Sequence, residues 1–174
     1  MKSVIKIWQH LHYNIYRLNS FSQMYGIGIP FTLLYRNRKV KEFFKNKREI
    51  KNPELFFKKI LTDPQNSTVI NISDSFMLII TCILAFACIN FASALSGRIV
   101  AVNKILFVAL LIIPCITINY YILWKNDKYL SYFKEFDKEP KAVKQKWAWI
   151  SLGVVIGSIL LLIFSFWVMT NAIH

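Results

Sequence analysis

The sequence predicts an all-α integral membrane protein with three transmembrane helices, because three uncharged apolar runs are long enough to cross a bilayer. The runs are Phe76–Leu95, Ile105–Trp124 and Ile150–Met169, each of twenty residues. A helix of that length rises about 30 Å, which matches the hydrocarbon thickness of a membrane. A hydrophobic content of 55% in 174 residues is also higher than an ordinary soluble domain has.

The distribution of basic residues predicts how these spans are oriented. Thirteen of the twenty-two Lys and Arg residues lie in residues 1–68, two in residues 98–104 and seven in residues 125–146. Under the positive-inside rule the first and third blocks are cytoplasmic, so the C-terminus lies outside. We expect the protein in a plasma membrane or an equivalent inner membrane, most simply the bacterial cytoplasmic (inner) membrane.

The chain therefore divides into a basic N-terminal part and a helix bundle. Residues 1–68 are expected to form cytoplasmic or interfacial amphipathic helices, and residues 69–174 a bundle with spans at about 75–96, 104–125 and 148–170. In the cytoplasmic hairpin 126–147, aromatic residues recur every three or four positions from Tyr129 to Phe136, which predicts an amphipathic helix. We expect this helix to continue the second span, and a further helix to start at Pro140.

The first eighteen residues predict an amphipathic helix in the headgroup region. One face of this helix carries Val4, Trp8, Leu11, Ile15 and Leu18, while Lys and Arg occupy the others. The alternative is a helix that packs on the protein's own cytoplasmic part.

Residues 19–35 are uncharged, but Gly26, Gly28 and Pro30 interrupt them and weaken a continuous helix. We expect a re-entrant or interfacial segment, with a fourth span as the alternative. Two short basic helices are expected to follow, at Arg38–Arg48 and Pro53–Thr62.

Small side chains predict where the spans pack against other helices. In lipid, helices associate by close backbone contact over small residues. The candidate helix-packing residues form one strip in the first span and a G-x-x-x-G motif in the third: Thr81, Ala85, Cys88, Ala92, Gly153 and Gly157.

Polar and helix-breaking residues mark further positions in or near the spans. Pro114 predicts a kink in the second span, and Asn90 and Asn119 are expected each to bond another helix. Asp74 is expected to cap the start of the first span, with a buried proton-relay carboxylate as the alternative. Gly97 is expected to end that span in the left-handed conformation.

Tryptophans near the ends of the helices predict aromatic anchors at the membrane interface. The expected interfacial anchors are Trp8, Trp124, Trp147, Trp149 and Trp167.

No pattern in the sequence predicts catalysis, a metal site or a cofactor. Cys82, Cys88 and Cys115 lack metal-ligand or redox spacing, and His10 and His12 are placed on different faces of a helix. The net charge of +13 is explained by basic cytoplasmic loops that contact anionic lipid headgroups, so no nucleic acid partner is expected.

We therefore expect a non-catalytic subunit or scaffold that contacts another membrane protein, or a second copy of itself, through its helices. The alternative is a self-assembling pore or channel. A hydrated path requires a full polar stripe along a span, and no span shows one.

Overall fold

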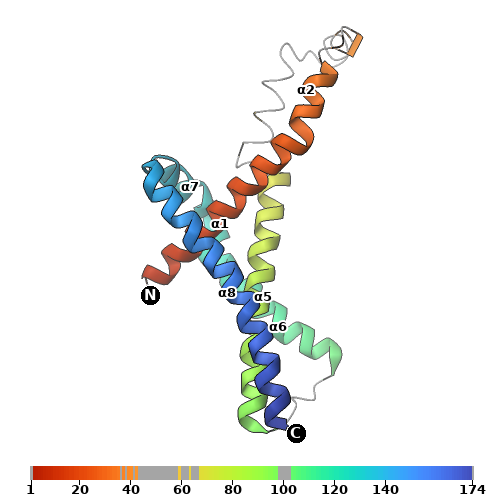
Figure 1. Ribbon diagram of the computed structural model, residues 1–174, viewed down its shortest axis with the longest axis vertical. Helices are drawn as coiled ribbons and strands as arrows, with labels where there is room; N and C mark the ends of the chain where they lie inside the picture. Colours follow the sequence, from red (N-terminus) through yellow and green to blue (C-terminus); the bar gives the residue numbers. More distant parts are fainter. Residues whose placement is uncertain are drawn as a thin grey trace. The chain divides into compact units, whose positions relative to one another are not determined.

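The computed structural model describes residues 2–35, 37, 39–40, 42, 59, 63, 67–97 and 103–173. Every secondary-structure element among these residues is helical (Figure 1). The two basic helices expected at Arg38–Arg48 and Pro53–Thr62 fall almost entirely outside the described residues.

Three of the helices are long and apolar enough to cross a membrane. They are α5 (Ser67–Ser96), α6 (Lys104–Asn119) with its continuation η2 (Tyr120–Trp124), and α8 (Lys141–Ile173). The all-helical fold class with three long apolar helices is thus confirmed. At the end of α5, Gly97 has a φ of 60°, so it adopts the left-handed conformation expected for a residue that ends a helix.

The link between α6 and α8 is interrupted instead of continuing the second apolar helix. The π-helical turn η2 is followed by the 3₁₀ turn η3 (Lys125–Asp127), in which Asn126 and Asp127 have φ angles of 57° and 52°. These left-handed angles break the helix, and Asn and Asp tolerate them better than most residues. The expectation of an uninterrupted helix from the second span into the hairpin is therefore wrong.

Helix α7 (Lys128–Asp137) forms the middle of the hairpin, as the aromatic spacing predicts. Tyr132, Phe133 and Phe136 are buried and Tyr129 is half-buried. Its aromatic face is therefore the inner face of an amphipathic helix.

The N-terminal segment is helical without a break through α1 (Lys2–Gln23), η1 (Met24–Gly28) and α2 (Ile29–Tyr35). Gln23 and Ile29, which flank the π-helical turn η1, both have right-handed helical dihedral angles. The glycines at 26 and 28 thus coincide with a wider turn, which is a common adjustment inside a helix, and they do not end it.

The chain divides into two compact units, and the boundaries fall inside α1 and α5. Unit 1 contains residues 1–14 and 74–174, and unit 2 contains residues 15–73. Within unit 2, the Asn19 side-chain amide donates to the Val69 carbonyl at 2.9 Å, and Tyr16 and Ser20 are buried.

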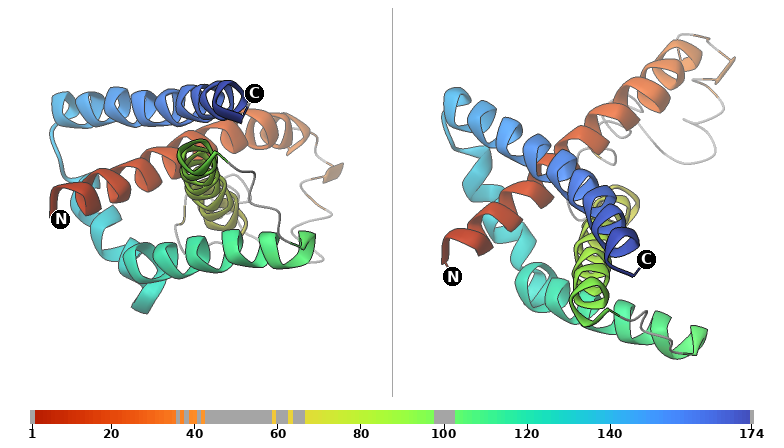
Figure 2. Two further views of the ribbon diagram at one scale, coloured as in Figure 1. Left: turned by 90° about the horizontal axis from the view of Figure 1, so that it is seen from below. Right: turned by 60° about the horizontal axis from the view of Figure 1, so that its bottom comes forward.

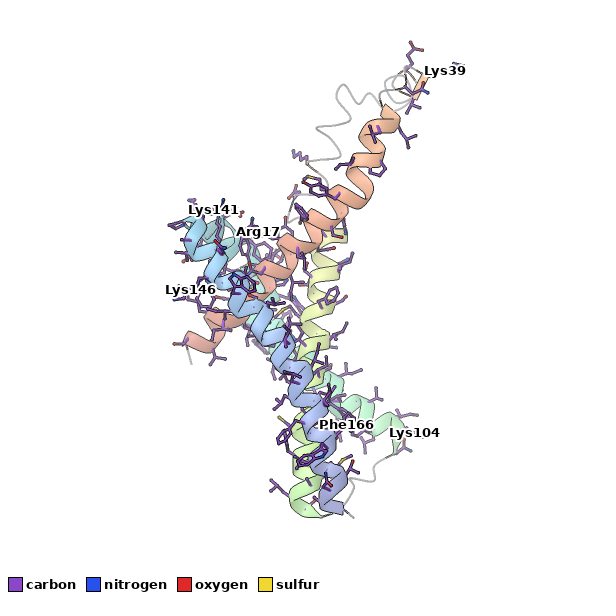
Figure 3. The ribbon with its side chains drawn as sticks, viewed as in Figure 1. Arg17, Lys39, Lys104, Lys141, Lys146 and Phe166 are labelled. Carbon is purple, nitrogen blue, oxygen red and sulfur yellow. The ribbon has the colours of Figure 1, made fainter. Side chains whose placement is uncertain are left out.

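Within unit 1, α8 runs beside α5 over their C-terminal halves (Figures 1 and 2). Phe86 of α5 contacts Phe166 of α8 with a centroid distance of 5.6 Å, and Figure 3 marks the position of Phe166. Phe86 also contacts Phe107 of α6 at 5.9 Å. α6 is attached along one side only, because Cys115 and Asn119 are buried while most of its other side chains are exposed.

The predicted packing strip of α5 is not the face that this chain buries. Thr81 is buried and Ala85 half-buried, but Cys88 and Ala92 are exposed. The side of α5 that faces α8 instead includes the buried Asn90 and Ser93, and the Asn90 amide bonds Ser165 of α8. Contact of the exposed strip with a helix of another chain stays a prediction.

The glycines of α8 also lie away from its intramolecular contacts. Gly153 and Gly157 are exposed, and a Cβ atom added at either would meet no neighbour within 4 Å. The buried side of α8 instead carries Ser151, Ser158 and Ser165, which recur every seven residues. This serine stripe was not predicted, although the heptad spacing of small polar residues is visible in the sequence.

Candidate functional site

The centre of unit 1 is the N-terminal part of α1. Four consecutive residues from His10 to Tyr13 are buried, and His12 is 0% exposed. Consecutive side chains of a helix point in all directions, so this part of α1 is surrounded by other helices. The alternative of packing on the protein itself is therefore what the structure contains for these residues, while the position of this helix in the headgroup region stays a prediction.

His12 connects α1 to both α5 and α7. Its Nδ1 atom lies 2.5 Å from the Tyr132 hydroxyl. Its Nε2 atom lies 2.9 Å from Asp74 Oδ1, which is ion-pair distance, although the two groups lack hydrogen-bond alignment. When Nε2 carries the ring proton, the Tyr132 hydroxyl donates to Nδ1. The three side chains therefore form a Tyr132–His12–Asp74 series.

Asp74 lies inside helix α5 and does not cap it, so the capping prediction is wrong. α5 begins at Ser67, about two turns before the apolar run. Asp74 is therefore an interior residue of the helix. Its side chain accepts a hydrogen bond from Trp124 Nε1 at 2.7 Å. Asp74 thus joins α5, η2 and α1 through its partners Trp124 and His12.

His10 occupies an aromatic site between α7 and α8. Its ring stacks on Phe136 with a centroid distance of 3.7 Å and on Trp147 at 4.0 Å, with interplanar angles of 14° and 6°. Glu139 Oε1 lies 3.8 Å from His10 Nε2, too far for a hydrogen bond. Burial, and to a lesser extent the positive charge of Lys6, lower the pKa of His10 from its usual 6.5 to about 4. His10 is therefore a neutral, stacked ring at neutral pH.

Two further hydrogen bonds hold α1 to the hairpin. The Tyr13 hydroxyl donates to Asp137 of α7, and the Asn14 amide donates to the Ser151 hydroxyl of α8 at 2.8 Å.

Asn119 connects α1, α6 and α5. It accepts a hydrogen bond from Trp8 Nε1 at 3.1 Å and donates to the Thr81 hydroxyl at 2.8 Å and to the Cys115 carbonyl at 3.0 Å. Asn119 is fully buried, so these partners replace the water that a polar group otherwise requires.

Asn90 connects α5 to α8, since its amide donates to the Ser165 hydroxyl at 3.1 Å. Both asparagines of the apolar runs therefore bond a side chain of another helix. Pro114 is exposed inside α6, and the hydroxyl of nearby Thr117 bonds the Ile113 carbonyl at 2.8 Å. The kink that Pro114 predicts stays a prediction.

No protein family model, curated protein or solved structure matches this chain.

The Tyr132–His12–Asp74 series has the order of groups that can move a proton. Burial raises the pKa of the Tyr132 hydroxyl, however, so loss of its proton is unfavourable. Tyr132 is 5% exposed, so the series is enclosed by the helices that it joins. Among the described residues, no group of three His, Cys, Asp or Glu side chains is placed to hold a metal ion.

Three of the predicted tryptophan anchors contact side chains of another helical element inside unit 1. Trp8 bonds Asn119, Trp124 bonds Asp74 and Trp147 stacks on His10. Trp149 and Trp167 are exposed.

Sequence reasoning missed the histidine site because its members come from separate segments. His10 and His12 stand out only as neutral polar residues between Trp8 and Tyr13, and Asp74 only as an acid next to an apolar run. The signal in the sequence is that α1 carries aromatic and histidine side chains on more than one face. This pattern indicates a helix that is buried on several sides.

Proposed function

We propose that this chain is an integral membrane protein that acts as a non-catalytic subunit or scaffold, with α5, α6–η2 and α8 as its membrane spans. It would bind another membrane protein, or a second copy of itself, through helix faces that its own fold leaves open. Its basic cytoplasmic segments would contact anionic lipid headgroups.

The open face of α8 is the observation that carries this proposal. Gly153 and Gly157 lie one turn apart in a long apolar helix, and neither has a neighbour within 4 Å of its Cβ position. Glycines at this spacing allow two helix backbones to approach closely in lipid. Because no helix of this chain packs against Gly153 and Gly157, a helix of another chain is the proposed partner of this motif.

The burial of the histidine site supports a non-catalytic role. His12 and Tyr132 are both enclosed by the helices they join, and the hydrogen bonds of the site run between α1, α5, η2 and α7. The site therefore stabilises the arrangement of helices in unit 1.

The pore alternative receives less support. Asn90 and Asn119, the amides that a lumen would need, are buried with partners in the same chain. Thr117 bonds its own helix. If the pore hypothesis were right, liposomes containing the protein would leak ions and Asn119→Leu would alter the leak.

The size of the particle extracted into lipid nanodiscs tests the subunit proposal, measured by native mass spectrometry. We expect a discrete complex for the natural chain, and its loss when Gly157→Leu fills the open face. Ala148→Leu adds similar bulk at another exposed position of α8 and should leave the complex intact. A natural chain that is monomeric without a partner, or equal effects of both variants, would contradict the proposal.

A further inference from the structure

The contacts of unit 1 determine on which side of the membrane the N-terminus lies. α1 bonds or stacks on residues at one end of each apolar helix: Asp74 near the start of α5, Asn119 at the end of α6 and Trp147 in the second turn of α8. It also contacts Phe136 in the hairpin helix α7. Residues 2–14 are therefore at the hairpin end of the spans, which the positive-inside rule makes cytoplasmic.

The segment between Asn14 and Asp74 consequently starts and finishes on the same side. A chain that returns to its starting side crosses the bilayer an even number of times. Residues 18–35 are the only uncharged run of near-span length in this segment, because Lys, Arg, Asp or Glu recur at short intervals from residue 36 to residue 63. A single crossing is excluded because the segment ends on the side where it starts. Two crossings are excluded because the segment contains only one apolar run of sufficient length.

The helix formed by residues 15–35 also does not turn back on itself. α1, η1 and α2 follow one another with helical dihedral angles at both junctions. A re-entrant segment reverses its direction inside the membrane, and an unbroken helix cannot do so. Residues 18–35 are therefore expected to form a continuous helix on the cytoplasmic side that neither spans the membrane nor re-enters it.

One side of this helix carries a line of exposed apolar side chains. Leu18, Phe21, Tyr25 and Leu33 are 70%, 57%, 52% and 59% exposed, and their spacings of three, four and eight residues keep them on one face. Tyr16 and Ser20, on the opposite side, are buried in unit 2. We call these four exposed residues the apolar stripe.

We propose that residues 18–35 form an in-plane membrane anchor, with the apolar stripe inserted among the lipids of the cytoplasmic leaflet. Basic residues flank the segment in sequence, with Arg17 before it and Arg36, Arg38 and Lys39 after it, and Figure 3 labels Arg17 and Lys39. Aromatic and leucine side chains on one face, with cations at the ends, suit an anionic lipid surface better than a protein groove.

Site-specific fluorescence quenching tests this anchor. A chain with Cys82, Cys88 and Cys115 replaced by Ala would carry single cysteines at Phe21, Leu33, Lys39 or Lys134, all exposed positions, each labelled with an environment-sensitive fluorophore. The labelled protein would be reconstituted in vesicles of phosphatidylcholine and phosphatidylglycerol. Circular dichroism would verify that each variant keeps its helix content.

We expect shallow lipid nitroxides to quench the probes at 21 and 33 several-fold more than aqueous iodide does, and the reverse at 39 and 134. Stronger quenching at 21 and 33 by iodide would show that the stripe lies in water. Quenching by nitroxides at the bilayer centre alone would show a span, and quenching by neither would show burial against protein. Each of these results would overturn the proposal.

Labelling with an impermeant maleimide tests the same-side argument. Cysteines at Ser3 and Lys39 should react from the side that labels a cysteine at Lys134, and labelling from opposite sides would overturn the proposal. Neither measurement depends on a partner. A monomeric protein could therefore fail the subunit proposal and still have this anchor.

Discussion

The buried His12 meets the partly exposed Asp74 within unit 1, with His12 Nε2 2.9 Å from Asp74 Oδ1. This contact joins the N-terminal helix to the first apolar helix, and it brings together the two ends of the intervening segment. Neither residue has an alternative partner of opposite charge among the described ion pairs. The stability of α1 within the unit should therefore depend on this carboxylate.

Replacement of Asp74 should destabilise the fold. Asp74→Ala leaves Trp124 Nε1 without its acceptor and removes the charge beside His12, and a buried donor without a partner costs about 1–3 kcal/mol. We expect a lower midpoint of thermal unfolding in detergent. Asp74→Asn retains an acceptor oxygen for Trp124 and should lose less. Asp127→Asn, at an exposed left-handed position, serves as the control, and an equal loss there would contradict the assigned role.

Acid should weaken the fold through His10. The folded chain keeps His10 neutral down to a pKa of about 4, whereas the unfolded chain binds this proton near pH 6.5. Between these values the unfolded state binds more protons, so stability falls as pH decreases from about 6.5 to about 4. The full effect is roughly 3 kcal/mol.

His10→Phe removes this proton while it keeps an aromatic ring between Phe136 and Trp147. The difference in unfolding midpoint between pH 7 and pH 4.5 should therefore be smaller in the variant than in the natural chain. An identical pH dependence of the two proteins would show that His10 is not the responsible group.

Asn119→Leu should destabilise the contact between α1, α5 and α6. The change removes the acceptor of Trp8 Nε1 and the donor to the Thr81 hydroxyl, at an expected cost of about 1–3 kcal/mol. Thr117→Val, two residues away in the same helix, removes a hydroxyl that bonds only its own backbone. Denaturation by sodium dodecyl sulfate would rank the two variants, and a larger loss for Thr117→Val would refute the prediction.

Ser165→Ala should loosen α8 from α5, because Asn90 then keeps a buried amide without its acceptor. We expect a loss of about 0.5–2 kcal/mol, in the range of hydrogen bonds between membrane helices. Ser158→Ala is the matched control on the same buried stripe, since the Ser158 hydroxyl bonds the Val154 carbonyl of its own helix. The midpoint of thermal unfolding should be highest for the natural chain, lower for Ser158→Ala and lowest for Ser165→Ala.

The elements of this fold could be predicted from the sequence wherever a local pattern determines them. Uncharged runs of twenty residues identify the three apolar helices, because their length and composition alone are sufficient to recognise them. The aromatic spacing from Tyr129 to Phe136 identifies α7, and Gly97 marks the end of α5. The break at Asn126 and Asp127 could not be predicted, because nothing in their flanks distinguishes a left-handed turn from a continued helix.

The histidine site could not be predicted because it depends on which helices surround α1. The apolar face of α1 predicts one buried side, whereas His10 to Tyr13 are all buried and contact α5, α7 and α8. Asp74 was assigned to the wrong role for a related reason. The start of the apolar run is not the start of helix α5, which begins several residues earlier. Asp74 is therefore an interior residue of α5, and its side chain contacts the helices beside it.

The central position of α1 also determines when the protein can finish folding during its synthesis. Helix α1 forms one of its hydrogen bonds with a residue that is synthesised much later, since Asn14 and Ser151 are 137 positions apart. His10 and His12 therefore stay unburied until α7 and the start of α8 have emerged. A nascent chain that stalls before this point leaves the aromatic side chains of α1 accessible to chaperones and proteases, so protection of α1 requires the synthesis of α7 and the start of α8.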